Sequence, residues 1–224
     1  MASAQNDPDA LYRNRATLAD ARSAAALWDA QLKADARNFE AAWKLARVMY
    51  WLGNHESTED ARRAALERGI DAGQKVVALQ PSRPEGHFWI AANMGTLAES
   101  FGLRQGLKYR GKIKDELETV LRLDPGFMRG SADRALGRWY YRVPGLFGGS
   151  NKKSEEHLRK SLAYDANSTV SHFFLAETLI DMDREADAIE ELKKVLAAPY
   201  DADWEPEDRE YKQKASDLLA KLRR

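Results

Sequence analysis

The same helix ending recurs along the chain, and this repetition constrains the fold more than any other feature. The segment VLRLDP at residues 120–125 nearly repeats VVALQP at residues 76–81, an interval of 44 residues. Two later segments, SLAYDA at 161–166 and VLAAP at 195–199, follow a similar order of apolar positions and a stop. Self-similarity of this kind is typical of proteins built from stacked repeats. The sequence therefore predicts a helical repeat protein.

Apolar residues at helical spacing fill the segments between these endings. Trp43, Ala46, Met49 and Tyr50 are three or four residues apart or adjacent, as on one face of a helix. Further helical segments are expected at 84–100 and 107–123, on both sides of the loop 144–150, and around Phe173 and Leu192. Alternating apolar and polar residues never persist, so β structure should be nearly absent. The pattern predicts four helix hairpins.

Local signals set the expected boundaries. Asp7-Pro8 is typical of a helix start, Gly53-Asn54 of a helix end, and Ser57 of the cap of the next helix. The acids at 205–208 lie in the first turn of an expected last helix, where the helix dipole favours negative charge. We expect one continuous domain: a tail and capping helix over 1–37, four hairpins over 38–199 and a C-terminal capping helix over 200–224.

Composition excludes several classes of protein. Lys plus Arg and Asp plus Glu both number 35, so no net charge attracts nucleic acid, and nucleic-acid binding is not expected. The chain has no Cys, which rules out disulfides, thiol catalysis and cysteine zinc sites. No apolar run approaches the roughly 18 residues of a membrane span.

The N-terminus carries an ambiguous signal. Ala2-Ser3-Ala4 has the small-x-small form of a signal-peptide cleavage site, but no apolar segment precedes it. One interpretation is a leader removed before these residues and a periplasmic protein. The other is a polar, Ala-rich tail and a cytoplasmic protein.

Residue identity, rather than period, indicates the type of repeat. Corresponding positions at Trp43, His87, Asp133 and His172 are 44, 46 and 39 residues apart, closer to HEAT units than to tetratricopeptide (TPR) units. The fourth unit nevertheless has HxxLA followed by AIEEL at 188–192, which resembles the small-residue pattern of a TPR unit. The fold expected is an all-α, TPR-like α-solenoid with capping helices at both ends.

Two longer segments resemble a known subgroup of TPR proteins. These are PEGHFWIAANMG at 84–95 and ALGRWYYRVPGLFGGS at 135–150. They resemble the TRAP transporter T component and its eukaryotic relatives, the regulators of microtubule dynamics, and the resemblance covers residues 38–222. It implies a periplasmic, non-enzymatic helical protein that forms a homo-oligomer, a trimer by resemblance, and works with a periplasmic substrate-binding protein.

The glycine-rich loop at 145–152 is not a phosphate-binding loop. It lacks the four-residue spacing between glycines, the Lys-Ser/Thr pair and the preceding strand that such a loop needs. We expect a structural turn in which Leu146 and Phe147 pack into the core and Ser150 or Asn151 caps the next helix.

Other polar residues give no catalytic or metal-binding pattern. The four histidines are too far apart for a local ligand pair, and we expect His87 and His172 to pack between helices with one ring nitrogen hydrogen-bonded. The acidic stretch at 181–187 lacks the Gly and Glu of a calcium loop and is expected to be a turn. We predict no cofactor, no metal and no enzymatic activity; a hydrolase stays a minor alternative.

The inner surface of a TPR protein is formed by set positions on the first helix of each pair. Mapping these positions predicts a groove formed by Lys44, Trp51, Phe88, Arg134, Arg138, Tyr141, Phe173 and Glu177. Aromatic and cationic side chains suit a peptide carboxylate or an apolar ligand with an acid group. Alternatively, Trp51 and Phe173 are core residues, and Arg134 and Arg138 pair with nearby acids.

The function predicted is a non-catalytic TPR-type binding or scaffold protein. The resemblance associates it with TRAP-type solute transport, where its groove would bind a protein partner or a small ligand. The alternative is a cytosolic scaffold that binds peptide motifs or C-terminal carboxylates.

Overall fold

The computed structural model describes residues 7–222, with residues 103–105 described by their backbone alone, so Ala2-Ser3-Ala4 lies outside it. The described residues form eleven α helices and one short 3-10 turn, with no strand among them. The predicted all-α, TPR-like fold is confirmed. No helix among the described residues is long and apolar enough to cross a membrane.

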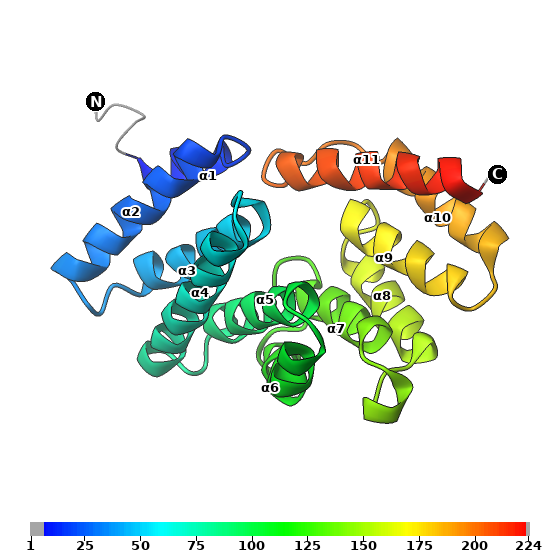
Figure 1. Cartoon of the computed structure of the whole chain (residues 1–224). Coiled ribbons are helices and arrows are strands. Elements are labelled where there is room, and N and C mark those ends of the chain that lie inside the picture. Colours follow the sequence, from blue (N-terminus) through cyan, green and yellow to red (C-terminus); the bar gives the residue numbers. More distant parts are fainter. Residues whose placement is uncertain (1–6, 223–224) are drawn as a thin grey trace. The chain divides into compact units, whose positions relative to one another are not determined.

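The chain divides into two compact units, Met1–Asp124 and Pro125–Arg224 (Figure 1). The first unit contains α1 (Pro8–Arg13), α2 (Leu18–Ala34), α3 (Phe39–His55), α4 (Glu59–Leu79), α5 (Pro84–Ser100) and α6 (Leu103–Leu123). The second contains α7 (Ser131–Arg142), the 3-10 turn η2 (Gly145–Phe147), α8 (Asn151–Tyr164), α9 (Thr169–Ile180), α10 (Glu185–Ala197) and α11 (Glu205–Leu222). The hairpins are α3–α4, α5–α6, α7–α8 and α9–α10.

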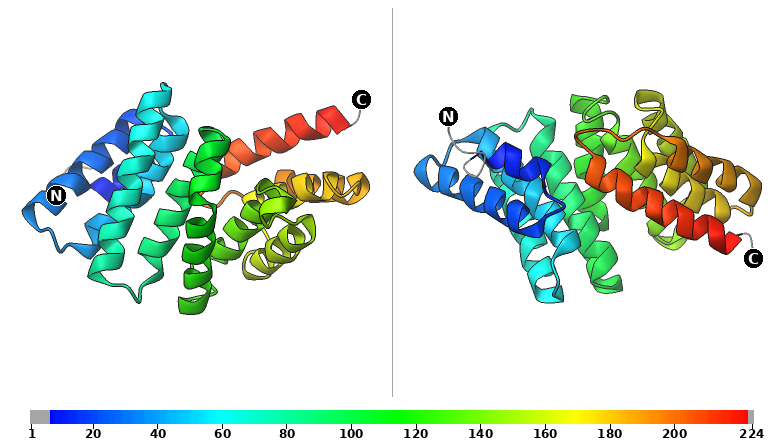
Figure 2. Two further views of the ribbon diagram at one scale, coloured as in Figure 1. Left: turned by 60° about the horizontal axis from the view of Figure 1, so that its bottom comes forward. Right: turned by 90° about the horizontal axis from the view of Figure 1, so that it is seen from above.

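Within the first unit, each helix packs against the next along the chain, and α3 also packs against α5 (Figure 2). Gly53 permits the close approach of α3 and α4, because a Cβ built there would overlap the Leu66 side chain. The helix end predicted at Gly53-Asn54 is therefore wrong: α3 continues to His55, and Gly53 is needed for packing rather than for termination.

The second unit is held together by one apolar core shared by α8, α9, α10 and α11. Leu158, Leu175, Leu179 and Leu192 are completely buried in it, and Leu219 of α11 closes its end. Burying one leucine side chain contributes about 1.5–3 kcal/mol. The core therefore fixes α9 between its hairpin partner α10 and the last helix.

Polar caps begin several helices where local sequence signals place them. Asp7 accepts a hydrogen bond from the Asp9 N–H, with Pro8 as the first helical residue, and Ser150 accepts one from the Lys153 N–H, as expected. The cap of α4 is Thr58 rather than the predicted Ser57, since the Thr58 side chain accepts from the Ala61 N–H.

The loop between α7 and α8 contradicts one prediction. Leu146 is 90% exposed and Phe147 37% exposed, so neither packs into the core. Backbone hydrogen bonds from Phe147 N–H and Gly149 N–H to the Pro144 carbonyl set the turn, and Gly148 has a φ of 103°. This backbone path directs the Leu146 side chain to solvent regardless of its hydrophobicity.

A hydrogen bond between a histidine and an acid joins the two helices of three hairpins, and it is buried in two of them. His87 Nδ1 on α5 lies 2.5 Å from Glu116 on α6, and His172 Nδ1 on α9 lies 2.5 Å from Glu191 on α10. In the hairpin between them the residue types are exchanged, because Asp133 on α7 pairs with His157 on α8 at 2.7 Å.

The ring contacts of His87 and His172 exceed the single hydrogen bond expected for each. Nε2 of His87 lies 3.0 Å from the Pro81 carbonyl oxygen, and Nε2 of His172 lies 3.0 Å from that of Ala166. The pairs therefore link each first helix to its partner helix and to the preceding turn.

Residues 181–184 of the acidic stretch form the turn between α9 and α10, whereas residues 185–187 already belong to α10. Asp183 adopts a left-handed conformation with a φ of 58°, and the Arg184 N–H donates to the Leu179 carbonyl at 2.9 Å. The interpretation of this segment as a turn is therefore confirmed for residues 181–184 and wrong for residues 185–187.

Candidate functional site

A stripe of partly exposed side chains runs along one side of α7. Arg134, Arg138 and Tyr141 are partly exposed at spacings of four and three residues, whereas Leu136 and Trp139 on the other sides are buried. Helical geometry places residues at these spacings on one face. Three of the predicted groove residues therefore share a surface of the second unit.

A matching stripe on α9 lies beside it. Val170, Phe174, Glu177 and Ile180 are the partly exposed positions of this helix. Arg138 Nη1 lies 2.7 Å from Glu177 Oε2, which joins the two stripes across neighbouring first helices. We call Arg134, Arg138, Tyr141, Phe174 and Glu177 the first-helix face of the second unit.

Aromatic rings surround the Arg138 guanidinium on this face. Its Cζ lies 4.6 Å from the centre of the Phe174 ring and 5.5 Å from that of Tyr141. A guanidinium over an aromatic face is stabilised electrostatically, and its planar fork suits carboxylates. The Arg138 side chain is 20% exposed, so this ordered cation reaches solvent.

Burial raises the pKa of the Tyr141 hydroxyl, and the nearby carboxylates of Glu177 and Asp181 raise it further, against the opposing effect of Arg138 and Arg142. At neutral pH the phenol is therefore protonated and can donate a hydrogen bond. The first-helix face thus presents a cation, a hydroxyl donor, an acceptor carboxylate and two aromatic rings.

The predicted residue Phe173 does not belong to this face. It is 9% exposed, and its ring meets Tyr211 of α11 edge-on with 5.4 Å between the ring centres. Thr169 of α9 also donates a hydrogen bond to Asp208 of α11 at 2.7 Å. The last helix therefore covers Phe173, and the exposed aromatic position is its neighbour Phe174, which the sequence mapping missed.

The groove residues predicted in the first unit lie in different surroundings. Trp51 is 3% exposed, donates its indole N–H to the Arg15 carbonyl at 2.8 Å and stacks on His55. Phe88 is buried against Trp89, and Lys44 Nζ pairs with Asp9 of α1 at 2.8 Å. Asp9 belongs to α1, and residue 15 follows shortly after this helix. The N-terminal segment therefore covers Lys44 and Trp51 on α3.

The predicted groove residues therefore separate into two sets. The structure brings Arg138, Tyr141 and Glu177 together with Arg134 on the second unit. The other four lie away from this face: Lys44 pairs with Asp9, and Trp51, Phe88 and Phe173 are in cores. The alternative interpretation, in which Trp51 and Phe173 are core residues and Arg138 pairs with a nearby acid, agrees with these contacts.

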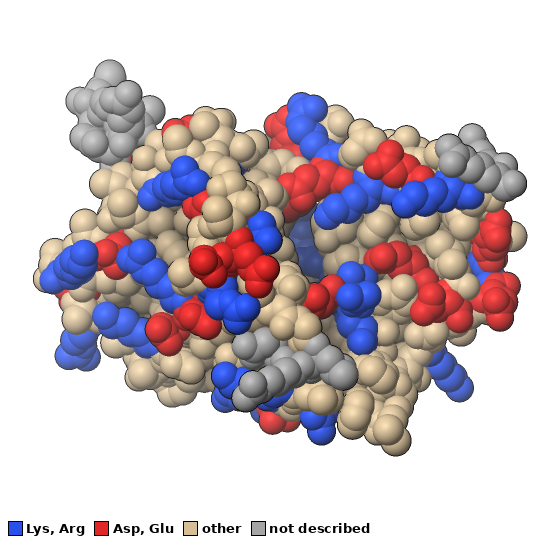
Figure 3. All heavy atoms as spheres, viewed as in Figure 1, with Lys and Arg blue, Asp and Glu red and all other residues tan. Residues whose placement is uncertain are grey.

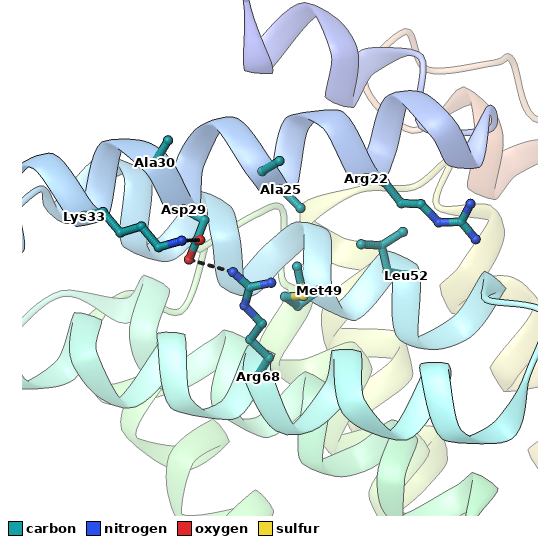
Figure 4. Close-up of a pocket in the computed structure, with 9 residues that line it drawn as sticks. Arg22, Ala25, Asp29, Ala30, Lys33, Met49, Leu52 and Arg68 are labelled. Atoms are coloured by element: carbon teal, nitrogen blue, oxygen red, sulfur yellow. Dashed lines mark ion pairs between the residues drawn. The ribbon is translucent and has the colours of Figure 1, made fainter.

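A hollow of about 370 Å³ opens on the first unit, between α2 and α4 with α3 as its floor (Figure 4). We call it the α2–α4 hollow. Met49 and Leu52 form its floor, and the residues that line it include the basic side chains of Arg22, Lys33 and Arg68. No sequence motif indicated it, because its walls come from three helices.

Elsewhere the surface carries mixed charge. On the side drawn in Figure 3, basic and acidic side chains are interspersed over both units. Among residues 7–222, no cluster of three or more His, Asp or Glu side chains is arranged to hold a metal ion.

Two family models match this chain, each over more than half of its length. The model of the TRAP transporter T-component matches residues 79–223, and that of regulator of microtubule dynamics protein 1-3 matches residues 6–147. A curated relative, regulator of microtubule dynamics protein 1 of Caenorhabditis elegans, is 29% identical over 83 residues. That match spans 37% of this chain and 36% of the relative, so the chain aligns with about a third of the relative's length.

Solved structures resemble the fold over nearly the whole chain. The thermophilic TPR protein TTC0263 of Thermus thermophilus superposes with a TM-score of 0.71 at 21% identity, covering 96% of this chain and 99% of that one. MamA of Desulfovibrio magneticus has a TM-score of 0.55 at 18% identity, covering 86% and 95%. These likenesses establish a TPR fold.

Proposed function

Because the chain belongs to the two families whose models match it, TRAP transporter T-component and regulator of microtubule dynamics protein 1-3, we propose that it is a non-catalytic binding protein of TRAP-type solute transport. Its partner in this proposal is the substrate-binding protein of such a transporter, and the two proteins meet in the periplasm. The first-helix face of the second unit is the surface that binds it.

The observation that carries the proposal is the ordered, solvent-reaching Arg138. The guanidinium is fixed by Glu177 at 2.7 Å and by the Phe174 and Tyr141 rings, so it loses little side-chain freedom when a partner binds. Interfaces concentrate binding energy in Arg and Tyr side chains that are surrounded by apolar area. The first-helix face places Arg138 and Tyr141 of α7 beside the apolar ring of Phe174 of α9.

A partner carboxylate can join this arrangement while the Glu177 contact persists. A guanidinium carries five N–H donors in a planar fork that suits carboxylates, and Nη1 of Arg138 lies 2.7 Å from Glu177 Oε2. The Tyr141 hydroxyl, protonated at neutral pH, can donate a hydrogen bond to the same incoming carboxylate. The partner segment in this proposal therefore carries an exposed Asp or Glu next to an apolar residue.

The test is binding of the purified chain to the substrate-binding protein of a TRAP transporter from the same organism, measured by isothermal titration calorimetry. Arg138→Ala and Phe174→Ala should each weaken binding on the order of tenfold or more, as expected for central interface residues. Arg159→Ala serves as the control, since Arg159 lies on α8 and pairs with Glu155 of its own helix.

The cytosolic alternative gives a different result in the same assay. A scaffold for C-terminal carboxylates would bind short acidic C-terminal peptides and not the substrate-binding protein. Binding to neither, by a folded wild-type chain, contradicts both proposals.

A further inference from the structure

The α2–α4 hollow is a second candidate site, on the other side of α3 from the residues that contact α1. Lys44 faces Asp9 of α1, whereas Met49 and Leu52 point into the hollow (Figure 4). The volume of about 370 Å³ lies within the range of small-molecule sites. The hollow belongs entirely to the first unit, so it does not depend on the surface proposed above.

The walls of the hollow are apolar because α2 contributes short side chains there. Ala25, Ala26 and Ala30 line one side, and Ala26 and Ala30 are exposed or partly exposed. Met49 and Leu52 lie beneath them and are almost completely buried. Alanine at these positions leaves a channel along α2 in which a slender alkyl chain removes apolar surface from water.

The polar residues around the hollow are mainly cations. Arg22, Lys33 and Arg68 line it together with one acid, Asp29, and Arg22 also donates two hydrogen bonds to Glu56, so three cations face two acids. This excess of positive charge is local, because the chain as a whole carries equal numbers of basic and acidic residues. An anionic group is therefore favoured at this surface over a neutral or cationic one.

Asp29 already occupies the position that a ligand anion would take. Its Oδ1 lies 2.6 Å from Arg68 Nη2 of α4 and its Oδ2 lies 2.9 Å from Lys33 Nζ of its own helix, so one carboxylate binds two cations, one of them across the hollow (Figure 4). The Arg68 side chain is 48% exposed, and its guanidinium has donors beyond the one that Asp29 engages. A second carboxylate can therefore bind beside Asp29.

We propose that the α2–α4 hollow binds an unbranched alkyl carboxylate, with the chain against Met49, Leu52 and the alanines of α2 and the carboxylate on Arg68 and Lys33. A compact anion such as phosphate is disfavoured because it has no alkyl group to bury against the apolar walls. Uncharged alkanes and alcohols should bind less tightly, because they carry no negative charge with which Arg68 and Lys33 can pair.

The test is titration calorimetry of the whole chain with hexanoate, octanoate and decanoate, each below its micelle concentration, with decanol as the uncharged probe. Affinity should rise by about fourfold for each added methylene, the factor that corresponds to about 0.8 kcal/mol per buried CH₂. Decanol should bind more weakly than decanoate on the order of tenfold, because it lacks the charge-assisted hydrogen bonds.

Three variants separate the head group from the tail. Arg68→Gln should weaken decanoate binding on the order of tenfold, and Asp29→Asn should strengthen it, because Asp29 then no longer competes for Arg68 and Lys33. Ala26→Leu should weaken it by partly filling the channel. Ala26 is exposed, so this change leaves the core intact.

Matched controls remove the same charge or add the same volume elsewhere. Arg122→Gln and Ala64→Leu, both at exposed helical positions outside the hollow, should bind decanoate as the wild type does. Circular dichroism verifies the fold of each variant. The proposal is overturned by an absence of decanoate binding to the wild type at millimolar concentration, by an affinity independent of chain length, or by equal affinities of folded Arg68→Gln and wild type.

Discussion

His172 and Glu191 are joined by a buried hydrogen bond, with 2.5 Å between Nδ1 and Oε2, that links α9 to α10. The ammonium group of Lys194 binds the same carboxylate at 2.9 Å. Because α9 also carries Phe174 and Glu177 of the first-helix face, this pair helps to fix the helix that presents the candidate binding surface. The equivalent pair of the second hairpin, His87 and Glu116, also has a lysine, Lys112, on its carboxylate.

Replacing Glu191 should destabilise the fold strongly. Glu191→Ala leaves the buried His172 ring without its carboxylate, and leaving a buried hydrogen-bonding group without its partner costs about 1–3 kcal/mol. Glu190→Ala, the neighbouring exposed position paired with Lys193, should change stability by less than about 0.5 kcal/mol. Denaturant unfolding of the two variants checks the difference, and equal midpoints would contradict this account of the pair.

Acid should remove part of this stability. Burial alone would raise the pKa of the Glu191 carboxyl, but hydrogen bonds from His172 and Lys194 outweigh it and hold the pKa below the ordinary value of 4.5. A carboxyl whose pKa is lower in the folded state stabilises the fold above its unfolded pKa, and that contribution is lost as the pH falls through the folded value.

The free energy of unfolding should therefore decrease below about pH 4.5 more steeply for the wild type than for Glu191→Gln, which cannot titrate at this position. Urea titrations at several values between about pH 3 and pH 7 measure how the free energy of unfolding of each protein depends on pH. Parallel curves for the two proteins would show that Glu191 makes no such contribution.

Alanine substitutions at two helical glycines should change the stability of the fold in opposite directions. A Cβ at Gly95 of α5 meets nothing within 4 Å, so Gly95→Ala should stabilise the helix by about 0.5–1 kcal/mol through backbone entropy. A Cβ at Gly69 of α4 would overlap Oδ1 of the fully buried Asn93, so Gly69→Ala should destabilise the chain. Thermal unfolding by circular dichroism checks both signs.

The exposed loop leucine should contribute little to stability. Leu146 is 90% exposed, so Leu146→Ser should change the free energy of unfolding by less than about 0.5 kcal/mol. Gly149→Ala in the same loop should be clearly destabilising, because its Cβ would collide with the Val143 carbonyl oxygen. A large loss of stability in Leu146→Ser would mean that this residue packs against the protein after all.

Local signals in the sequence predicted the helices well. The starts at Asp7-Pro8 and Ser150 depend on side chains that cap their own helix, so neighbouring residues suffice to recognise them. The helix at 84–100 has the bounds of α5, because Pro84 begins it and apolar periodicity continues to its end. Such features need no knowledge of the rest of the chain.

The candidate site was harder to predict because its contacts are long-range. Phe173 and Phe174 are both apolar and adjacent, and it is Tyr211, far along the chain, that pairs with both rings while α11 covers Phe173. The acid partners of His87 and His172 are 29 and 19 residues away, at no fixed spacing. Leu146 was misplaced because hydrophobicity predicts burial, whereas backbone hydrogen bonds set the direction of this turn.

The most direct test of the proposed function is hydrogen–deuterium exchange of the whole chain, alone and with the substrate-binding protein of a TRAP transporter from the same organism. The account predicts slower exchange on binding in α7 and α9, the helices of the first-helix face, with α2 and α4 unchanged. Slower exchange confined to other helices, or no change at concentrations that saturate binding, would contradict it.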